Sequence, residues 1–378
     1  MVPLVDLKAQ YLSIKEELDE AVAGVISRAT FIEGEEVALF EREFANYCGA
    51  RDAVCVGSGT DALRLALAAA GIGPGDEVIT TPLTFAATVE TICQLGARPV
   101  FVDIVSDTCN IDADEIASAI TDKTRAILPV HLHGNPANMT KIMEVAEAHG
   151  LKVVEDAAQA HGARYKGEHV GTFGDAGCFS FFPSNNLGTF GNAGAVITDD
   201  FELAEKIRLL RNHGRIDKYD HACVGYNSRI GTIQAAVLRV KLPYLDGWNE
   251  LRRALAEEYR TRLSDCGVEF ISEEPDGRHV YHRFVIRTPE RGHWRRALTS
   301  AGIESGLHFP VPLHLQPAYR DLKYQSGDFP VSEQAAGEVL SLPMYPELSV
   351  FQVAEITKIF DGRGPQSLEQ HLEVAAGS

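Results

Sequence analysis

The stretch AVCVGSGTDALRLALAAA (53–70) joins a short apolar strand, a turn of small residues and a helical repeat. Apolar runs of the same kind recur as far as residue 198, and helical patterns lie between several of them. These runs are EVIT (77–80), PVFVDI (99–104), AILPV (126–130), KVVED (152–156), CFSFF (178–182) and AVIT (195–198). Strands that alternate with helices predict βαβ units and a mostly parallel sheet buried on both faces. The last runs are too close together for intervening helices, so we expect part of the sheet to be antiparallel.

Helical patterns flank this region on both sides. Apolar residues at helical spacing predict an amphipathic helix over residues 12–29. A second, longer pattern over 242–263 is expected to lead out of the sheet. Beyond it, HRFVIRT (282–288) predicts a further strand, and the three prolines of PVPLHLQPAY (310–319) predict a loop.

We therefore predict a large domain over residues 1–245, which includes the N-terminal helix, and a small domain over 246–362. The polar, small-residue-rich segment 363–378 is interpreted as a frayed tail.

The composition is that of an ordinary globular protein, with 45% hydrophobic and 23% charged residues among 378. A formal net charge of −18 argues against nucleic acid or an anionic membrane as the main partner. The N-terminus lacks the basic and apolar pattern of a secretion signal, and no apolar stretch is long enough to span a membrane. Seven dispersed cysteines without a CxxC pair fit reduced thiols, so we expect a cytoplasmic protein.

No metal site is predicted. His131 and His133 alternate on an apparent strand and would share one face. Because no third ligand lies nearby in the sequence, packing in the core or a pocket is favoured over metal ligation.

The turn VGSGTDAL (56–63) is the first candidate binding segment. Free N–H groups and the helix dipole favour an anion at a helix start, and Gly57 and Gly59 would let its backbone come close. Ser58 and Thr60 add hydroxyl groups. The alternative is a plain strand-to-helix turn that is capped by Thr60.

The second candidate is VVEDAAQAHGA (153–163), in which an apolar strand ends in two carboxylates. Ligands of open α/β sheets bind at the carboxyl ends of the strands. Asp156 could pair with a protonated ring nitrogen, and Gln159 could hydrogen-bond a ring hydroxyl. The alternative for Asp156 is a capping carboxylate.

A third segment, GCFSFFPSNNLGTFGNAGAVIT (177–198), combines a buried strand, a loop rich in glycine and asparagine, and another strand. With the first two segments, and in the same order and spacing, it resembles the DegT/DnrJ/EryC1/StrS family of nucleotide-sugar aminotransferases that depend on pyridoxal phosphate (PLP). Further matching motifs are PLVDLKAQY (3–11), GDEVITTPLTFAAT (75–88), GYNSRIGTIQAA (225–236) and PVPLHLQPAY (310–319). The resemblance implies the type I aminotransferase fold, in which a large domain with a mostly parallel seven-stranded sheet is joined to a small C-terminal α/β domain.

The resemblance also implies roles for residues around the coenzyme. Gly59, Thr60 and Ser180 match the cup that holds its phosphate. Phe85 matches the aromatic side chain that stacks on the ring, with a core phenylalanine as the alternative. Asp156 matches the partner of the pyridine nitrogen.

Other matched positions concern the ring oxygen, the partner subunit and the sugar. Gln159 matches the contact to the ring oxygen. Asn227 matches a residue that reaches the phosphate from the neighbouring subunit, and Arg229 matches one near the substrate, which together imply a homodimer with shared active sites. His308 and His314 lie where the family builds its sugar pocket, although loop histidines are often simply exposed.

The sequence departs from the family at the residue that carries its chemistry. The loop FSFFPSNNLG has Asn185 where the family has the lysine that forms a Schiff base with the coenzyme. An amide nitrogen is conjugated to its carbonyl, so it can neither form that bond nor act as the base that moves the substrate proton. A second departure is Asn192, where an acidic residue is common.

Three hypotheses follow. The chain is an engineered variant of a working sugar aminotransferase that can trap a coenzyme–sugar adduct. Alternatively, it is a natural homologue with altered chemistry, such as the sugar dehydratases that use the amine form of the coenzyme (PMP). The third possibility is a non-catalytic or PLP-free protein that binds a sugar or pairs with an active homologue.

Since the phosphate cup, Asp156 and Gln159 are retained, we expect PLP or PMP to bind non-covalently and transamination to be nearly absent. The family implies a nucleotide-linked keto-sugar as substrate and glutamate or glutamine as amino donor.

Overall fold

The structure is a computed structural model, and it describes residues 1–360. Its centre is a seven-stranded sheet in the order β1-β9-β8-β5-β4-β2-β3. The strands are β1 (Asp52–Val56), β2 (Glu77–Thr80), β3 (Arg98–Phe101), β4 (Thr124–Ile127), β5 (Lys152–Asp156), β8 (Ala176–Ser180) and β9 (Gly194–Thr198). Only β9 runs antiparallel to its neighbours, β1 and β8. Both the mostly parallel sheet and the antiparallel exception near its end were expected from the sequence, and the α/β fold class is confirmed.

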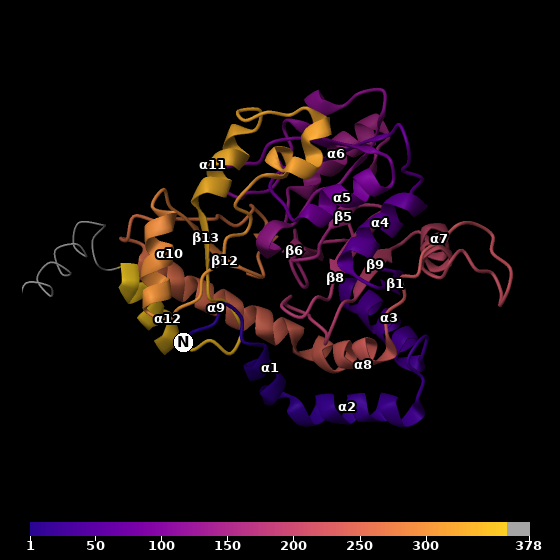
Figure 1. The fold of residues 1–378 in the computed structure, drawn as a ribbon, viewed down its shortest axis with the longest axis horizontal. Helices are drawn as coiled ribbons and strands as arrows, with labels where there is room; N and C mark the ends of the chain where they lie inside the picture. Colours follow the sequence, from indigo (N-terminus) through magenta and orange to yellow (C-terminus); the bar gives the residue numbers. More distant parts are fainter. Residues whose placement is uncertain (361–378) are drawn as a thin grey trace, which may run out of the picture.

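Both faces of the sheet are buried, as the nearly continuous apolar strands predicted. Along β1, Val54 and Val56 belong to one apolar cluster, whereas Ala53 and Cys55 belong to the cluster on the opposite face. The reason is that successive side chains of a β-strand point to opposite faces of the sheet. The helices around the sheet are α3 (Glu35–Cys48), α4 (Gly59–Ala69), α5 (Ala86–Gln94), α6 (Met139–His149), α7 (Phe201–Arg211) and α8 (Thr232–Lys241). Figure 1 shows α4 and α7 on the opposite side of the sheet from α8.

The long helix α9 (Leu245–Leu263) leads from the central sheet to a second group of elements (Figure 1). The short turn η3 (Leu242–Tyr244) precedes it, in agreement with the predicted helix over 242–263. The second group has a three-stranded sheet in the order β10-β12-β13. Its elements are β10 (Glu269–Phe270), β12 (Phe284–Arg287), β13 (Val339–Leu342), α10 (Arg291–Ser300), α11 (Pro330–Glu338), α12 (Val350–Thr357) and η6 (Lys358–Phe360).

Smaller elements complete the described chain. A second three-stranded sheet pairs β6 (Arg164–Tyr165) with β7 (Glu168–His169) and β11 (Gly277–Arg278). Single 3₁₀ turns are η1 (Ile116–Ala119), η2 (Leu132–Gly134), η4 (Leu313–Leu315) and η5 (Pro317–Leu322). η4 lies in the segment 310–319 predicted as a loop, and η5 begins in it and runs on to Leu322, so this loop is built largely of short turns.

The N-terminal segment differs from the prediction in two ways. The expected helix over 12–29 is two helices, α1 (Leu7–Ser13) and α2 (Lys15–Arg28), which meet at a non-helical Ile14. Before α1, the backbone of Val2 bonds to Gly302 and Glu304, so the first residues pack on the C-terminal elements. The predicted tail over 363–378 lies outside the described residues. Within residues 1–360, no helix has the length and apolar character needed to cross a membrane.

Candidate functional site

Three strands bring candidate residues to one edge of the sheet. Val56, Asp156 and Ser180 are the last residues of β1, β5 and β8. These strands are parallel to one another, because β5 pairs parallel with β8, and β1 and β8 both run antiparallel to β9. The side chains and turns that follow therefore meet at the carboxyl edge of the sheet, where open α/β sheets bind ligands.

The turn between β1 and α4 forms a tight cradle at this edge. Ser58 caps α4 by accepting a hydrogen bond from the N–H of Asp61 at 3.0 Å, so Ser58 rather than Thr60 is the cap residue. A Cβ added to the buried Gly59 would lie 2.5 Å from Cβ of Ser180. The N–H of Gly57 donates to Ser228 Oγ at 3.1 Å. The helix start, with its dipole and close-packed backbone, thus faces the end of β8 as an anion site requires.

Asp156 is a buried carboxylate at the same edge. It is 5% exposed, and it accepts hydrogen bonds from Thr88 Oγ1 at 2.8 Å and from the N–H of Ala158 at 3.2 Å. Burial raises the pKa of the Asp156 carboxyl above its ordinary value, while these two hydrogen bonds act in the opposite direction. In residues 1–360 no lysine or arginine pairs with it. A buried carboxylate without a cationic partner is well suited to meet a positively charged ligand group.

Gln159 follows Asp156 by three residues, and Phe85 precedes α5, whose Thr88 bonds Asp156. Gln159 Oε1 accepts a hydrogen bond from the N–H of His133 at 2.7 Å. Phe85 is 58% exposed, so the alternative of a core phenylalanine is wrong. Its ring lies 5.9 Å from that of Phe309, centroid to centroid. An exposed aromatic ring at a helix start is free to stack on a flat ligand.

Asn185 lies in the loop between β8 and β9. It is partly buried, and its side-chain Nδ2 donates to the carbonyl oxygen of Ser180 at 2.6 Å. Its own N–H donates to the carbonyl of Phe182 at 2.9 Å. The side chain of Asn185 is thus directed back to the end of β8, which is also the strand end that contacts Gly59.

Neighbouring loop residues are fixed by contacts to α8 and α9. Asn186 is 1% exposed, and its amide donates to Asn249 Oδ1 at 2.8 Å and to Val280 O at 2.9 Å. The hydroxyl of Thr189 donates to the carbonyl of Gln234 at 3.0 Å. These bonds define the course of the loop on both sides of position 187.

A buried lysine that is distant in sequence also holds this loop. Lys241 is 3% exposed, and its Nζ donates to the carbonyl of Gly188 at 2.8 Å and to Gln10 Oε1 at 2.9 Å. Burial lowers the pKa of Lys241 to about 8. This contact could not be predicted from the sequence, because 53 residues separate Lys241 from Gly188 and no local pattern distinguishes Lys241 from other helical lysines.

The remaining candidates are dispersed. Asn227 is exposed and accepts a hydrogen bond from Arg229 Nη2 at 3.0 Å. His308 is half-buried, and its Nδ1 lies 2.9 Å from Ser341 Oγ. His314 is 2% exposed and bonds to Glu333 at 3.0 Å, so it is not an exposed loop histidine. No hydrogen bond within residues 1–360 joins any of these four to Asp156.

The paired histidines do not share a strand, and that prediction was wrong. The chain leaves the sheet near Val130, and His133 adopts φ +60° inside a 3₁₀ turn. His131 Nε2 lies 3.0 Å from the buried carboxylate of Glu155, which also accepts three backbone N–H groups. This is the packed, hydrogen-bonded role that the sequence favoured. Residues 1–360 contain no group of three or more metal-ligating side chains.

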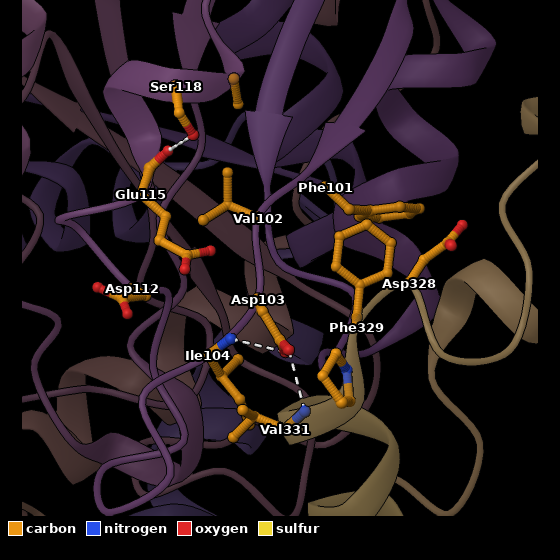
Figure 2. Close-up of a pocket in the computed structure, with 12 residues that line it drawn as sticks. Phe101, Val102, Asp103, Ile104, Asp112, Glu115, Ser118, Asp328, Phe329 and Val331 are labelled. Carbon is orange, nitrogen blue, oxygen red and sulfur yellow. Dashed lines mark hydrogen bonds between the residues drawn. The ribbon is translucent and has the colours of Figure 1, made fainter.

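A further groove of about 330 Å³ is lined by Phe101 and Phe329, against which the ring of His314 packs (Figure 2). Its centre is Asp103, which accepts hydrogen bonds from the N–H groups of Val331 and Ser332 at the start of α11. Phe101 and Phe329 pack edge to face beside it. The carboxylate acts as a helix cap that joins β3 to α11, so its charge is already used within the fold.

The family is decided by comparison with known sequences. The sequence model described as the DegT/DnrJ/EryC1/StrS aminotransferase family matches residues 12–361. The chain belongs to this family. A relative from Streptomyces venezuelae, a dTDP-3-amino-3,4,6-trideoxy-alpha-D-glucose transaminase, is 47% identical over 92% of each chain.

Solved structures agree with this assignment. DesV of S. venezuelae, in complex with a ketimine intermediate, superposes with a TM-score of 0.93 and 46% identity over 95% of this chain and 97% of that chain. NtdA of Bacillus subtilis, with bound PMP, has a TM-score of 0.86 and 32% identity over 92% of this chain and 81% of that chain. The fold expected from the sequence motifs is therefore that of the family's aminotransferases.

Proposed function

We propose that this protein binds PLP or PMP non-covalently at the carboxyl edge of the central sheet, together with a nucleotide-linked keto-sugar, and that Asn185 nearly abolishes its transamination. The proposal includes a homodimer with shared sites, to which Asn227 and Arg229 contribute across the interface, and glutamate or glutamine as amino donor. The observation that carries it is the cradle around Gly59, Asp156 and Ser180, beside a loop whose residue 185 has no amine.

The residues of the cradle fit a phosphorylated pyridine. The start of α4, with Gly59, Thr60 and Ser180, would hold the phosphate, because its N–H groups and hydroxyls are donors and the carboxylate in its first turn, Asp61, is paired with Arg64. Phe85 would stack on the ring. When bound, PLP supplies an electron-withdrawing ring that stabilises negative charge on a substrate carbon.

Asp156 would keep that ring protonated. Burial destabilises its charge, so the carboxylate gains most when a cationic N–H pairs with it. Thr88 orients the carboxylate from one side through Oδ2, and Ala158 fixes the other oxygen. Gln159, which is held by the N–H of His133, would present its side chain to the ring oxygen.

Asn185 is the residue that limits the chemistry. Its amide has no basic lone pair, so it can neither bond covalently to the coenzyme nor move a proton at the substrate carbon. Its Nδ2 already donates to the carbonyl of Ser180. Lys241 is the buried amine at this loop, but its Nζ is engaged by Gly188 and Gln10.

Replacement of Asn185 by lysine tests the proposal directly. Asn185→Lys should become covalently linked to PLP, which borohydride reduction and mass spectrometry detect as a single added coenzyme on the peptide that contains residue 185. It should also gain transamination of a nucleotide keto-sugar. Asn185→Gln is the matched control, because it changes side-chain length but supplies no amine.

Two results would contradict the proposal in different ways. If Asn185→Lys binds no coenzyme, the cradle is not a PLP site. If the unchanged protein transaminates a keto-sugar at about 1 per second or more, the role given to Asn185 is wrong.

The engaged state of Lys241 favours a second candidate, a non-catalytic sugar-binding or partner protein of the same fold. Asn185 has no amine, and Nζ of Lys241 is bonded to Gly188 and Gln10, so neither residue offers a free amine to a coenzyme. Titration with PMP separates them: a saturable change in coenzyme absorbance supports the first candidate, and no change supports the second.

A further inference from the structure

The hydroxyl of Ser228 contacts the turn that leads into α4. Its Oγ accepts a hydrogen bond from the N–H of Gly57 at 3.1 Å, although 171 residues separate the two in the sequence. Ser228 is 1% exposed. Gly57 directly follows β1 and precedes Ser58, the cap residue of α4. A buried side chain from a distant segment thus fixes the backbone where the chain enters the cradle.

The segment that carries Ser228 is itself anchored to the end of α7. The N–H of Ser228 donates to the carbonyl of Arg211 at 2.8 Å, and the N–H of Tyr226 donates to that of Leu210 at 2.7 Å. Nη1 of Arg211 donates in turn to the carbonyl of Cys55 in β1 at 2.6 Å. One helix end therefore holds both the strand before the turn and the hydroxyl that contacts the turn, so the position of Ser228 Oγ is set by regular elements.

The same segment also contacts the group that neutralises the carboxylate nearest to the turn. Asp61 lies in the first turn of α4, and a Cβ added to Gly57 would be 2.8 Å from its Oδ2. Asp61 is ion-paired with Arg64, whose guanidinium carbon lies 4.4 Å from the centroid of the Tyr226 ring. An unpaired carboxylate at this place would repel an anion at the helix start. Tyr226 and Ser228 thus act on the charge and on the backbone of one turn.

We propose that Ser228 is a positioning residue for the phosphate of the coenzyme, because it holds Gly57 and so keeps the N–H groups at the start of α4 directed at one point. The inference rests on the coenzyme site of the proposed function. Gly57 and Gly59 give the turn a backbone freedom that is lost when an anion is bound. Ser58 restrains the turn from the helix side, and Ser228 restrains it from the strand side. Without the Ser228 hydroxyl, the phosphate has to order the turn as it binds, and its affinity falls.

The neighbours of Ser228 have a different role. Nη2 of Arg229 donates to Oδ1 of Asn227 at 3.0 Å, and Asn227 is exposed. The proposed function assigns these two side chains to the site of the partner subunit. Ser228, which lies between them in the sequence, is buried against the turn of its own subunit. Its effect on the phosphate is therefore exerted within one chain and through Gly57.

Titrations with PMP and with inorganic phosphate test this role. Ser228→Ala should bind PMP about tenfold more weakly, which corresponds to the loss of one hydrogen bond of about 1.4 kcal/mol. Inorganic phosphate, titrated against bound PMP at constant ionic strength, should also compete about tenfold more weakly in this variant. Asp156→Asn acts on the ring of the coenzyme, so it should weaken PMP binding but leave the competition constant of phosphate unchanged.

Two further variants separate positioning from a general loss of stability. Ser332→Ala is the matched control, because Ser332 is fully buried and its hydroxyl donates to Asp103, which follows the edge strand opposite to β1. It should lower the stability in urea, yet bind PMP and phosphate like the parent. Ser228→Cys keeps a side chain of similar shape with a weaker acceptor, so its PMP affinity should lie between those of the parent and Ser228→Ala.

The outcomes distinguish a failure of this inference from a failure of the proposed function. If the unchanged protein binds no PMP, the coenzyme site is absent and the role of Ser228 is wrong as well. If the unchanged protein and Ser228→Ala bind PMP equally well, the site stands and only the role of Ser228 is wrong. Weaker PMP binding with an unchanged competition constant for phosphate would also overturn the inference, because the effect would not pass through the phosphate turn.

Discussion

The contact between Gly59 and Ser180 allows a quantitative prediction. A methyl group at Gly59 would lie 2.5 Å from Cβ, 3.0 Å from Oγ and 3.1 Å from Cα of Ser180. Rotation of the Ser180 side chain cannot relieve contacts to Cβ and Cα, so the backbone must move. Overpacking of this kind costs about 1–3 kcal/mol, and removal of a helical glycine returns about 0.5–1 kcal/mol at most. Gly59→Ala should therefore lower the free energy of unfolding by up to about 2.5 kcal/mol.

Urea unfolding of the coenzyme-free protein measures this change, and Gly247→Ala is the matched control. Gly247 lies inside α9 with no atom within 4 Å of an added Cβ, so its replacement should stabilise by about 0.5–1 kcal/mol. Ser180→Gly removes Cβ and Oγ, and in that background Gly59→Ala should cost at least about 1 kcal/mol less. If the cost is the same in both backgrounds, the two residues are not in the contact described.

Three further predictions concern buried charged groups. The raised pKa of Asp156 means that its ionised form destabilises the folded chain, and this loss develops as pH rises through that pKa. Asp156→Asn should thus unfold at an equal or higher urea concentration at neutral pH yet bind PMP at least tenfold more weakly; lower stability with unchanged affinity would contradict this. Because the pKa of Lys241 is lowered to about 8, the unfolded chain holds more protons between about pH 8 and 10.5, and stability should rise with pH there. Lys241→Met should remove that rise, and an unchanged pH profile would exclude Lys241 as its source. Glu155→Ala leaves the N–H of the buried Gly171 and those of the part-buried Phe173 and Gly174 without an acceptor, and it should cost about 3–5 kcal/mol in urea unfolding; a loss under about 1 kcal/mol would count against it.

Local patterns were sufficient to predict the sheet because its strands are buried on both faces. Each run is apolar almost throughout, and the spacing between runs limits where helices can fit. The same reasoning gave one helix over 12–29, because Ile14 keeps the apolar period while its backbone leaves the helix at φ −132°. It also placed His133 on a strand, since nothing in the side-chain pattern indicates a positive φ. Hydrophobic periodicity reports which face is buried, and it is insensitive to a single non-helical or left-handed residue.

Contacts between distant segments could not be predicted in this way. The order of motifs located Asp156 and Ser180, because each ends a strand and parallel strands share an edge. It gave no sign that Lys241 holds the carbonyl of Gly188, or that Nε and Nη1 of Arg283 are buried without an acceptor among residues 1–360. Both depend on which segments meet in three dimensions. The local residue pattern of a single sequence does not show which distant segments are in contact.

The loop between β8 and β9 shows why a change at position 185 can alter chemistry and leave the fold intact. Asn186, Gly188 and Thr189 fix its course through bonds to α8, α9 and the segment before β12. Among residues 1–360, Asn185 makes a side-chain hydrogen bond only to Ser180, five residues away, and that bond stays within the same strand and loop. The architecture therefore places few demands on the side chain at 185, whereas covalent attachment of the coenzyme would demand an amine there. Selection or design can change such a position without loss of the surrounding cradle, which is why the fold and the reaction need separate tests in this chain.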